Sequence, residues 1–109
     1  MLIDKFIDYL TLEKSYSHNT INAYYKDLKD FEKFSKSKFD NINIEDSNYS
    51  IIRSWIVELV NTGVSNRTVN RKVSSLKSFF KFLIKTDSIK SSPLEGHIPL
   101  KQKKKIQVP

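Results

Sequence analysis

The sequence contains no cysteine and only two glycines among its 109 residues. Without cysteine the chain can form no disulfide, no thiolate metal site and no thiol nucleophile. Two glycines are too few for a glycine-rich loop that cradles nucleotide phosphates. The two histidines, His18 and His97, lie far apart in the sequence and follow no metal-ligand spacing. We therefore expect no metal and no cofactor.

Long apolar runs and catalytic patterns are also missing. No stretch of eighteen consecutive apolar residues occurs, and Asp4 brings an acidic group too early for a signal peptide. Paired carboxylates and hydrolase triads do not occur at a recognisable spacing. We expect a cytoplasmic chain that neither enters a membrane nor carries catalytic residues.

Arginine is scarce, because the positive charge comes from sixteen lysines and only three arginines. The net charge of +7 is unevenly distributed: residues 65–109 carry +9 and residues 1–64 carry −2. A basic balance at one end of the chain indicates a polyanionic partner, with nucleic acid first and an anionic membrane second. A general lysine bias would explain the first half of the chain better than the second.

Helical periodicity dominates the sequence, and no segment alternates apolar and polar residues as a strand does. This predicts one all-α domain of four main helices in two hairpins, near residues 2–12, 17–37, 49–61 and 66–85. Ser17 and Ser65 are suited to cap the second and fourth helices. Gly63 is suited to the left-handed position after the third helix.

The fourth helix has one face that is typical of a contact surface. Its residues are Arg67, Arg71, Ser74, Ser78, Lys81 and Lys85. Small hydroxyl residues between cations allow close approach, and the fork of an arginine fits guanine edges or phosphate oxygens in a way that lysine cannot. The alternative for Arg67 and Arg71 is a pair of arginines that is merely solvated.

The second helix carries a polar stripe opposite its apolar one, formed by Asn19, Asn22, Lys26, Lys29 and Lys33. This stripe suits either phosphate or water. The acids Asp27, Asp30 and Glu32 alternate with lysines of the same helix. The simplest interpretation of these acids is a set of surface ion pairs of little energetic value.

After Ile89 the composition changes to serine, proline and then a run of lysines. We interpret residues 1–90 as the helical domain and residues 91–109 as an extended basic linker that is not packed on it. A chain does not normally end in this way, so we expect a further domain after it.

Several motifs in this order resemble the N-terminal core-binding, SAM-like domain of tyrosine recombinases and integrases, most closely the Xer type. They are Ser17-His-Asn-Thr-Ile-Asn-Ala-Tyr24, Asp27-Leu28, Gly63-Val-Ser65, Arg67-Thr68, Arg71-Lys-Val-Ser-Ser-Leu76 and Phe79-Phe-Lys-Phe-Leu83. The resemblance covers nearly the whole chain. It implies an orthogonal bundle that lays its second and fourth helices against the major groove of double-stranded DNA.

The resemblance also implies which residues meet DNA. On the second helix they are Asn19, Thr20, Asn22 and Lys26; on the fourth, Arg67, Thr68, Arg71, Lys72 and Ser75; in the linker, Lys101 and Lys103. None of the five tyrosines matches the family's nucleophile, and the catalytic residues belong to a following domain. The resemblance therefore implies a domain that binds DNA without cutting it.

The family's full-length members assemble with other recombinase protomers in a tetrameric synapse and serve DNA integration or chromosome-dimer resolution. We expect this chain alone to be a monomer. Two other functions stay open from the sequence. One is a helical protein-interaction module whose lysines reflect composition only, and the other is a stand-alone, phage integrase-like DNA-binding accessory domain.

Overall fold

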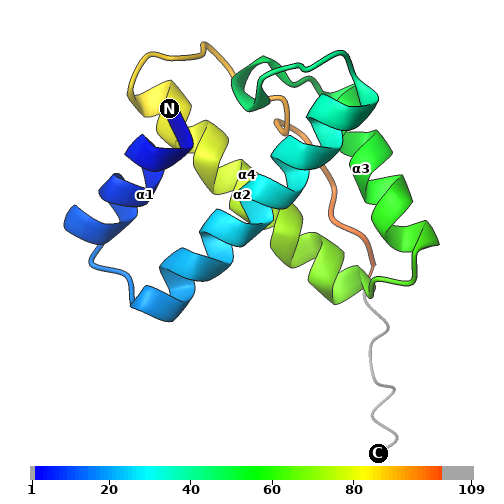
Figure 1. Ribbon diagram of the computed structural model, residues 1–109, viewed down its shortest axis with the longest axis horizontal. Helices are drawn as coiled ribbons and strands as arrows, with labels where there is room; N and C mark the ends of the chain where they lie inside the picture. The colour runs from blue at the N-terminus through cyan, green and yellow to red at the C-terminus, as the bar shows by residue number, and fades with distance from the viewer. Residues whose placement is uncertain (1, 102–109) are drawn as a thin grey trace, which may run out of the picture.

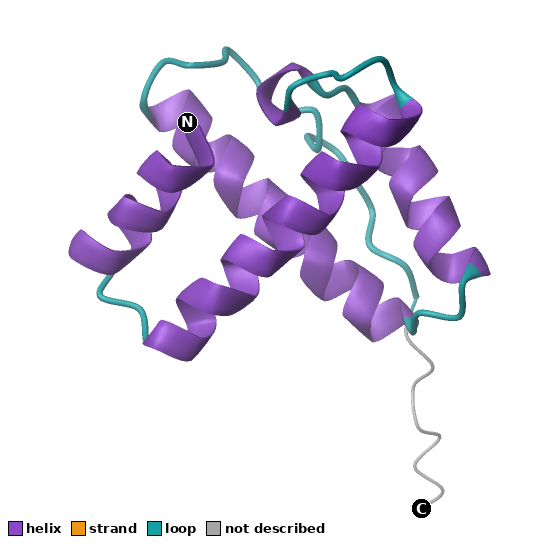
Figure 2. Cartoon of the chain, in the orientation of Figure 1, coloured by secondary structure: helices purple, strands orange, loops and turns teal. Residues whose placement is uncertain are grey.

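The computed structural model describes residues 2–101 and contains four α-helices, with no strand within those residues (Figures 1 and 2). The helices are α1 (Leu2–Leu12), α2 (His18–Lys38), α3 (Tyr49–Asn61) and α4 (Asn66–Lys85). A short 3₁₀ helix, η1 (Ile44–Asp46), lies between α2 and α3. The all-α prediction is confirmed, and the helix bounds agree with the predicted ones to within one residue.

Side-chain caps fix where three of the helices begin. The Thr20 N–H donates to Ser17 Oγ at 3.2 Å, and the Thr68 N–H donates to Ser65 Oγ at 3.2 Å. Asn48 caps α3 in the same way through the N–H of Ile51. Each cap satisfies an N–H group that has no partner inside its helix. Gly63 has a φ of +90°, so the turn between α3 and α4 requires glycine there.

The helices α2 and α4 cross at the centre of the molecule, with α1 at one end and α3 at the other (Figure 1). The crossing is filled by buried aromatic and aliphatic residues from all four helices. Phe6 of α1 meets Phe79 of α4 edge to face, with ring centroids 5.5 Å apart. At the other end Phe31 of α2 packs on Trp55 of α3 at 5.1 Å. The first pair attaches α1 to α4, and the second attaches α3 to α2.

The chain after α4 turns back and runs toward the N-terminal end of that helix (Figure 1). Leu94 is only 2% exposed, and the backbone of Leu100 is held on both sides by the Asn70 amide. Asn70 Nδ2 donates to Leu100 O at 2.8 Å, and Leu100 N donates to Asn70 Oδ1 at 2.9 Å. Asn66 Nδ2 donates to Lys101 O at 2.8 Å.

The expectation of an unpacked linker is therefore wrong for residues 91–101. The apolar residues Leu94 and Leu100 pack against the core, which a composition of serine, proline and lysine did not indicate. Tyr49 of α3 also contacts this segment, since its hydroxyl lies 3.3 Å from Nδ1 of His97. Lys103 and the rest of the lysine run lie outside the described residues.

Candidate nucleic-acid interface

A shallow groove of about 380 Å³ separates the N-terminal halves of α2 and α4. Its walls are formed by Asn19, Thr20, Ala23, Tyr24, Asp27, Arg71, Ser74 and Ser75. The groove therefore brings together residues of α2 and α4 that lie about fifty positions apart in the sequence. Four of the predicted DNA-contacting residues, Asn19, Thr20, Arg71 and Ser75, lie in it.

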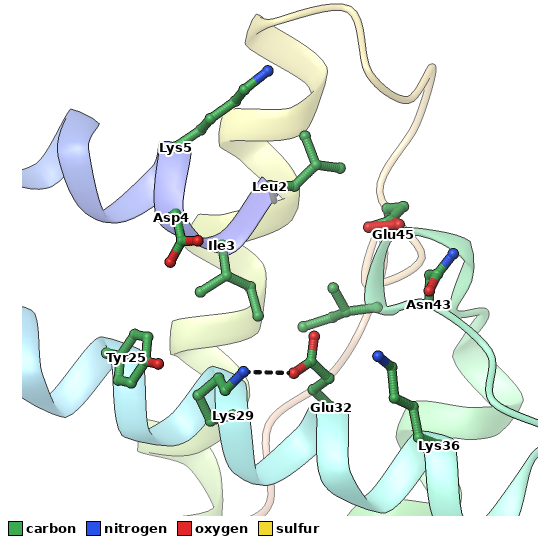
Figure 3. Close-up of a pocket in the computed structure, with 11 residues that line it drawn as sticks. Leu2, Ile3, Asp4, Lys5, Tyr25, Lys29, Glu32, Lys36, Asn43 and Glu45 are labelled. Atoms are coloured by element: carbon green, nitrogen blue, oxygen red, sulfur yellow. Dashed lines mark hydrogen bonds and ion pairs between the residues drawn. The ribbon is translucent and has the colours of Figure 1, made fainter.

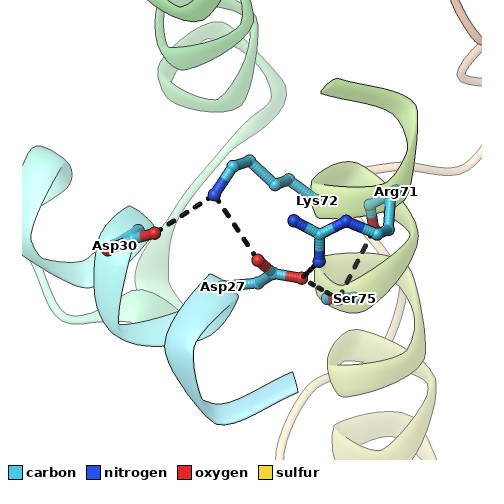
Figure 4. Close-up of polar contacts among 5 residues, drawn as sticks. All are labelled: Asp27, Asp30, Arg71, Lys72 and Ser75. Carbon is cyan, nitrogen blue, oxygen red and sulfur yellow. Dashed lines mark hydrogen bonds and ion pairs between the residues drawn. The ribbon is translucent and has the colours of Figure 1, made fainter. Parts of the chain in front are cut away.

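Asp27 occupies the floor of this groove and is only 1% exposed. Its Oδ2 accepts from Arg71 Nη1 at 2.6 Å and from Ser75 Oγ at 2.8 Å (Figure 4). Its Oδ1 lies 3.5 Å from Lys72 Nζ, which also contacts Asp30 Oδ2 at 3.1 Å. A buried carboxylate requires such partners, because removal from water is costly unless the charge is paired and hydrogen-bonded.

The interpretation of Asp27 as a surface ion pair within α2 is wrong. Asp27 stands beside Leu28 on the side of α2 that faces α4, so its carboxylate meets cations of the other helix. Asp30 is exposed and pairs with Lys72 rather than with a lysine of α2. Only Glu32 pairs as predicted, with Lys29 at 2.9 Å.

The predicted DNA-contacting residues differ in how accessible they are. Asn19, Thr20, Asn22, Lys26, Arg67, Arg71 and Lys101 are exposed. Thr68 is half-buried and its hydroxyl accepts from Ser65 as part of the α4 cap. The side chain of Lys72 is 13% exposed, and Ser75 is buried with its hydroxyl committed to Asp27. These two residues hold the groove together, and their contact with DNA stays a prediction.

Three residues important for this region were missed by sequence reasoning. Asp27 was assigned to the surface, while Asn66 and Asn70 were given no role. A signal for Asp27 did exist, since it lies within the apolar stripe of α2 and α4 contains no carboxylate to pair its own cations. No local signal marks Asn66 and Asn70, because their partner is the backbone of residues thirty or more positions away.

A second depression of about 350 Å³ lies between α1, α2 and η1 (Figure 3). Lys29 and Glu32 form an ion pair on its wall, and this hydrogen bond raises the pKa of Lys29. Asp4 and Glu45 lie on the opposite side, so cations and carboxylates are mixed. Such a lining does not favour a polyanion.

A larger groove of about 520 Å³ lies between α1 and the C-terminal half of α4. Its aromatic lining includes Tyr9, which has Lys85 Nζ 4.9 Å from its ring centre. Residues 2–101 contain no group of three or more acidic or histidine side chains that could hold a metal ion. Nor is any helix of the described chain long and apolar enough to cross a membrane.

The family model for the phage integrase N-terminal SAM-like domain matches residues 3–87. The chain belongs to this family. The resemblance drawn from the motifs and the SAM-like fold are thereby confirmed. The family model ends at residue 87, so the segment of residues 88–101 that packs along α4 is not part of the matched region.

Relatives of this SAM-like domain are named tyrosine recombinases. Tyrosine recombinase XerC of Bacillus subtilis (strain 168) is 37% identical over 102 residues, which are 93% of this chain and 33% of that protein. XerC of Leptospira interrogans serogroup Icterohaemorrhagiae serovar copenhageni (strain Fiocruz L1-130) is 45% identical over 91 residues, 82% of this chain and 28% of the relative.

Tyrosine recombinase XerD of Rickettsia bellii (strain RML369-C) is 36% identical over 93 residues, 84% of this chain and 30% of that protein. The chain thus spans about a third of the length of the curated relatives that it matches. No solved structure matches the chain.

Proposed function

We propose that this chain is the DNA-binding domain of a Xer-type, site-specific tyrosine recombinase and that it holds duplex DNA through the groove between α2 and α4. The observation that carries the proposal is the meeting of Asn19 and Thr20 with Arg71 in one groove of a domain from this family. Amides, hydroxyls and an arginine fork are the groups that read base edges and bind phosphates.

The charge around the groove supports the same proposal. The side of α4 that borders it continues from Arg71 to Arg67 in one direction and to Lys81 and Lys85 in the other, and all four side chains are exposed. On α2, Lys26 lies about 100° round the helix from Asp27. Cations on both helices fit the two phosphate backbones that border a major groove.

Five of the exposed predicted contacts are assigned to DNA directly in our proposal, namely Arg67, Arg71, Asn19, Asn22 and Lys26. Thr20 and Thr68 lie in the first turns of α2 and α4. Their own N–H groups donate to Ser17 and Ser65, and the other N–H groups of these turns favour a phosphate. Lys72 and Ser75 act through Asp27. Lys101 stands at the end of the segment that Asn66 holds, and we propose that it and Lys103 follow the duplex backbone.

In our proposal this domain binds DNA without cleaving it, and the strand cleavage is carried out by another part of the recombinase. The partners of the full-length protein are then DNA and further recombinase protomers in a tetrameric synapse. Integration of a mobile element and resolution of chromosome dimers are both compatible with this role.

The test is fluorescence anisotropy of the chain on a Xer-like inverted-repeat duplex and on a scrambled duplex, across a salt series. We expect binding to both with a steep loss of affinity as salt rises, and a preference for the repeat of roughly tenfold or more. A folded, helical chain that binds neither duplex at low salt would contradict the proposal. A protein-interaction module would then be the better interpretation.

A further inference from the structure

The buried carboxylate of Asp27 receives donors from a single stretch of α4, namely Arg71, Lys72 and Ser75 (Figure 4). Lys72 brings a positive charge near this carboxylate, and Ser75 supplies a further hydrogen bond. A lysine in place of Arg71 would supply the same positive charge beside Lys72. The arginine adds a rigid, planar fork with more donors than one carboxylate oxygen uses.

The Arg71 guanidinium is held at one end and free at the other. Its Nη1 is fixed 2.6 Å from Asp27 Oδ2, yet the side chain is 51% exposed. Within residues 2–101 no hydrogen bond or ion pair occupies its Nε or Nη2. These two nitrogens carry parallel N–H groups that match a pair of acceptors on one rigid ligand.

Such an acceptor pair is offered both by O6 and N7 of guanine and by two oxygens of a phosphate. The nearby Asp27 carboxylate offsets the charge of Arg71, which weakens its attraction for an anion. The same carboxylate fixes the direction of the fork, which matters most for a neutral acceptor pair of fixed geometry. The small side chains of Ala23 and Ser74 beside it leave room for a base edge to approach.

We propose that Asp27 is a positioning residue for sequence recognition, which holds Arg71 so that its Nε and Nη2 edge reads one guanine in the major groove. This inference rests on the proposed DNA-binding function. It assigns a specificity role to a residue that itself does not touch DNA. Lys72 keeps the Asp27 carboxylate from repelling the phosphates nearby, since its Nζ lies 3.5 Å from Asp27 Oδ1.

The experiment selects bound duplexes from a random library with the wild-type chain and with Asp27→Asn, Arg71→Lys and Asp30→Asn, each verified as folded by circular dichroism. We expect one guanine position in the wild-type selection whose preference falls roughly five- to hundredfold in Asp27→Asn and in Arg71→Lys. Asp30→Asn is the matched control, because its carboxylate is exposed and contacts Lys72 alone among α4 residues. It should leave the preference unchanged.

A double variant, Asp27→Asn with Arg71→Lys, tests whether Asp27 acts through Arg71. We expect it to lose no more of that preference than Arg71→Lys alone, because coupled residues are not additive. A loss of affinity that is equal for all sequences in Asp27→Asn would overturn the inference in favour of a structural or phosphate-binding role. If Asp27→Asn does not fold, an unchanged guanine preference in Arg71→Lys overturns it. If the wild type selects no duplex at all, the proposed function itself fails.

Discussion

Arg67 and Arg71 stand one helical turn apart on α4, and their surroundings differ sharply. The guanidinium of Arg71 lies against a buried carboxylate, whereas Arg67 is exposed and makes no ion pair within the described residues. A side chain that compensates a buried charge contributes to folding as well as to binding, whereas an exposed cation contributes to binding only. The two arginines should therefore respond differently to the same substitution.

We expect Arg71→Ala to lower the free energy of unfolding by about 1–3 kcal/mol, because Asp27 loses its shortest charged hydrogen bond while Lys72 and Ser75 remain. Arg67→Ala, the matched control, should change it by less than about 0.5 kcal/mol. Urea denaturation of both variants measures this difference. Equal stability of the two variants would show that the Asp27 pair contributes nothing to the fold.

For DNA, Arg67→Ala should weaken all sequences to a similar extent and reduce the slope of log K against log salt by about one. The reason is that an exposed cation without a fixed orientation acts on the phosphate backbone. Anisotropy titrations on repeat and scrambled duplexes across salt measure both quantities. A selective loss on the repeat alone would instead assign base reading to Arg67.

We expect the docking of the segment after α4 to depend on pH through His97, whose ring contacts Tyr49 of α3. Burial, with a smaller effect of Lys77, lowers the pKa of His97 below its ordinary value of 6.5. The imidazole of His97 therefore binds a proton more readily in the unfolded chain than in the folded protein. The contribution of neutral His97 to the free energy of unfolding is present in full above the pKa of the unfolded chain. It is lost as the pH decreases from about 6.5 through the lower pKa of the folded protein.

We expect the melting temperature of the wild type to fall relative to that of His97→Gln as the pH is lowered from 8 to 5. Thermal denaturation by circular dichroism at each pH measures the difference. Parallel curves for wild type and His97→Gln would rule out this role of His97.

At the scale of elements, the features that could be predicted are those whose interacting residues lie close together in the sequence. The four helices followed from periodicity and from caps such as Ser17 and Ser65, whose partners lie three residues away. The Asp27 network could not be predicted in the same way, because its partners are 44 to 48 residues away and depend on how α2 crosses α4. The packing of Leu94 likewise depends on a surface that only the assembled helices create.

The segment of residues 88–101 has no helix or strand, but side chains of α4 hold it in place. We expect Asn70→Ala to destabilise the protein by about 1 kcal/mol and to speed hydrogen exchange at the Leu100 amide, which donates to Asn70. Asn66→Ala removes a single exposed hydrogen bond and should have a smaller effect. Unchanged exchange at Leu100 in Asn70→Ala would show that other contacts hold the segment.

At the scale of the whole molecule, a single core joins both helical hairpins, so damage to it should affect every surface at once. Trp55 is buried against Phe31 and does not line the groove between α2 and α4. We expect Trp55→Ala to cost about 3–5 kcal/mol through the cavity that it leaves. Arg53→Ala, on the exposed side of α3, is the control and should be nearly neutral.

Any loss of DNA binding in Trp55→Ala should follow the fraction unfolded, as measured by denaturation at the temperature of the binding assay. A folded Trp55→Ala chain with weakened binding would indicate that α3 contributes to the interface directly.

The charge of the molecule also bears on its association. The isolated chain should be a monomer at micromolar concentration, because its net charge of +7 opposes the close approach of two copies. The groove between α1 and α4 is the surface that could overcome this repulsion, since Tyr16 and Ile84 on its rim are partly exposed and apolar. Sedimentation velocity checks the prediction. A dimer that Ile84→Asp dissociates would show that this groove binds a second copy.

The hydrogen bonds from Asn66 and Asn70 to the backbone of residues 100 and 101 also have a mechanical consequence. A force that pulls on the chain beyond Lys101 reaches these two amides before it reaches the hydrophobic core. These hydrogen bonds therefore take up the load first and delay its transfer to the hydrophobic core. In an optical trap, tension applied at that end should first release a short length of chain at low force, and only then unfold the helices in one cooperative step.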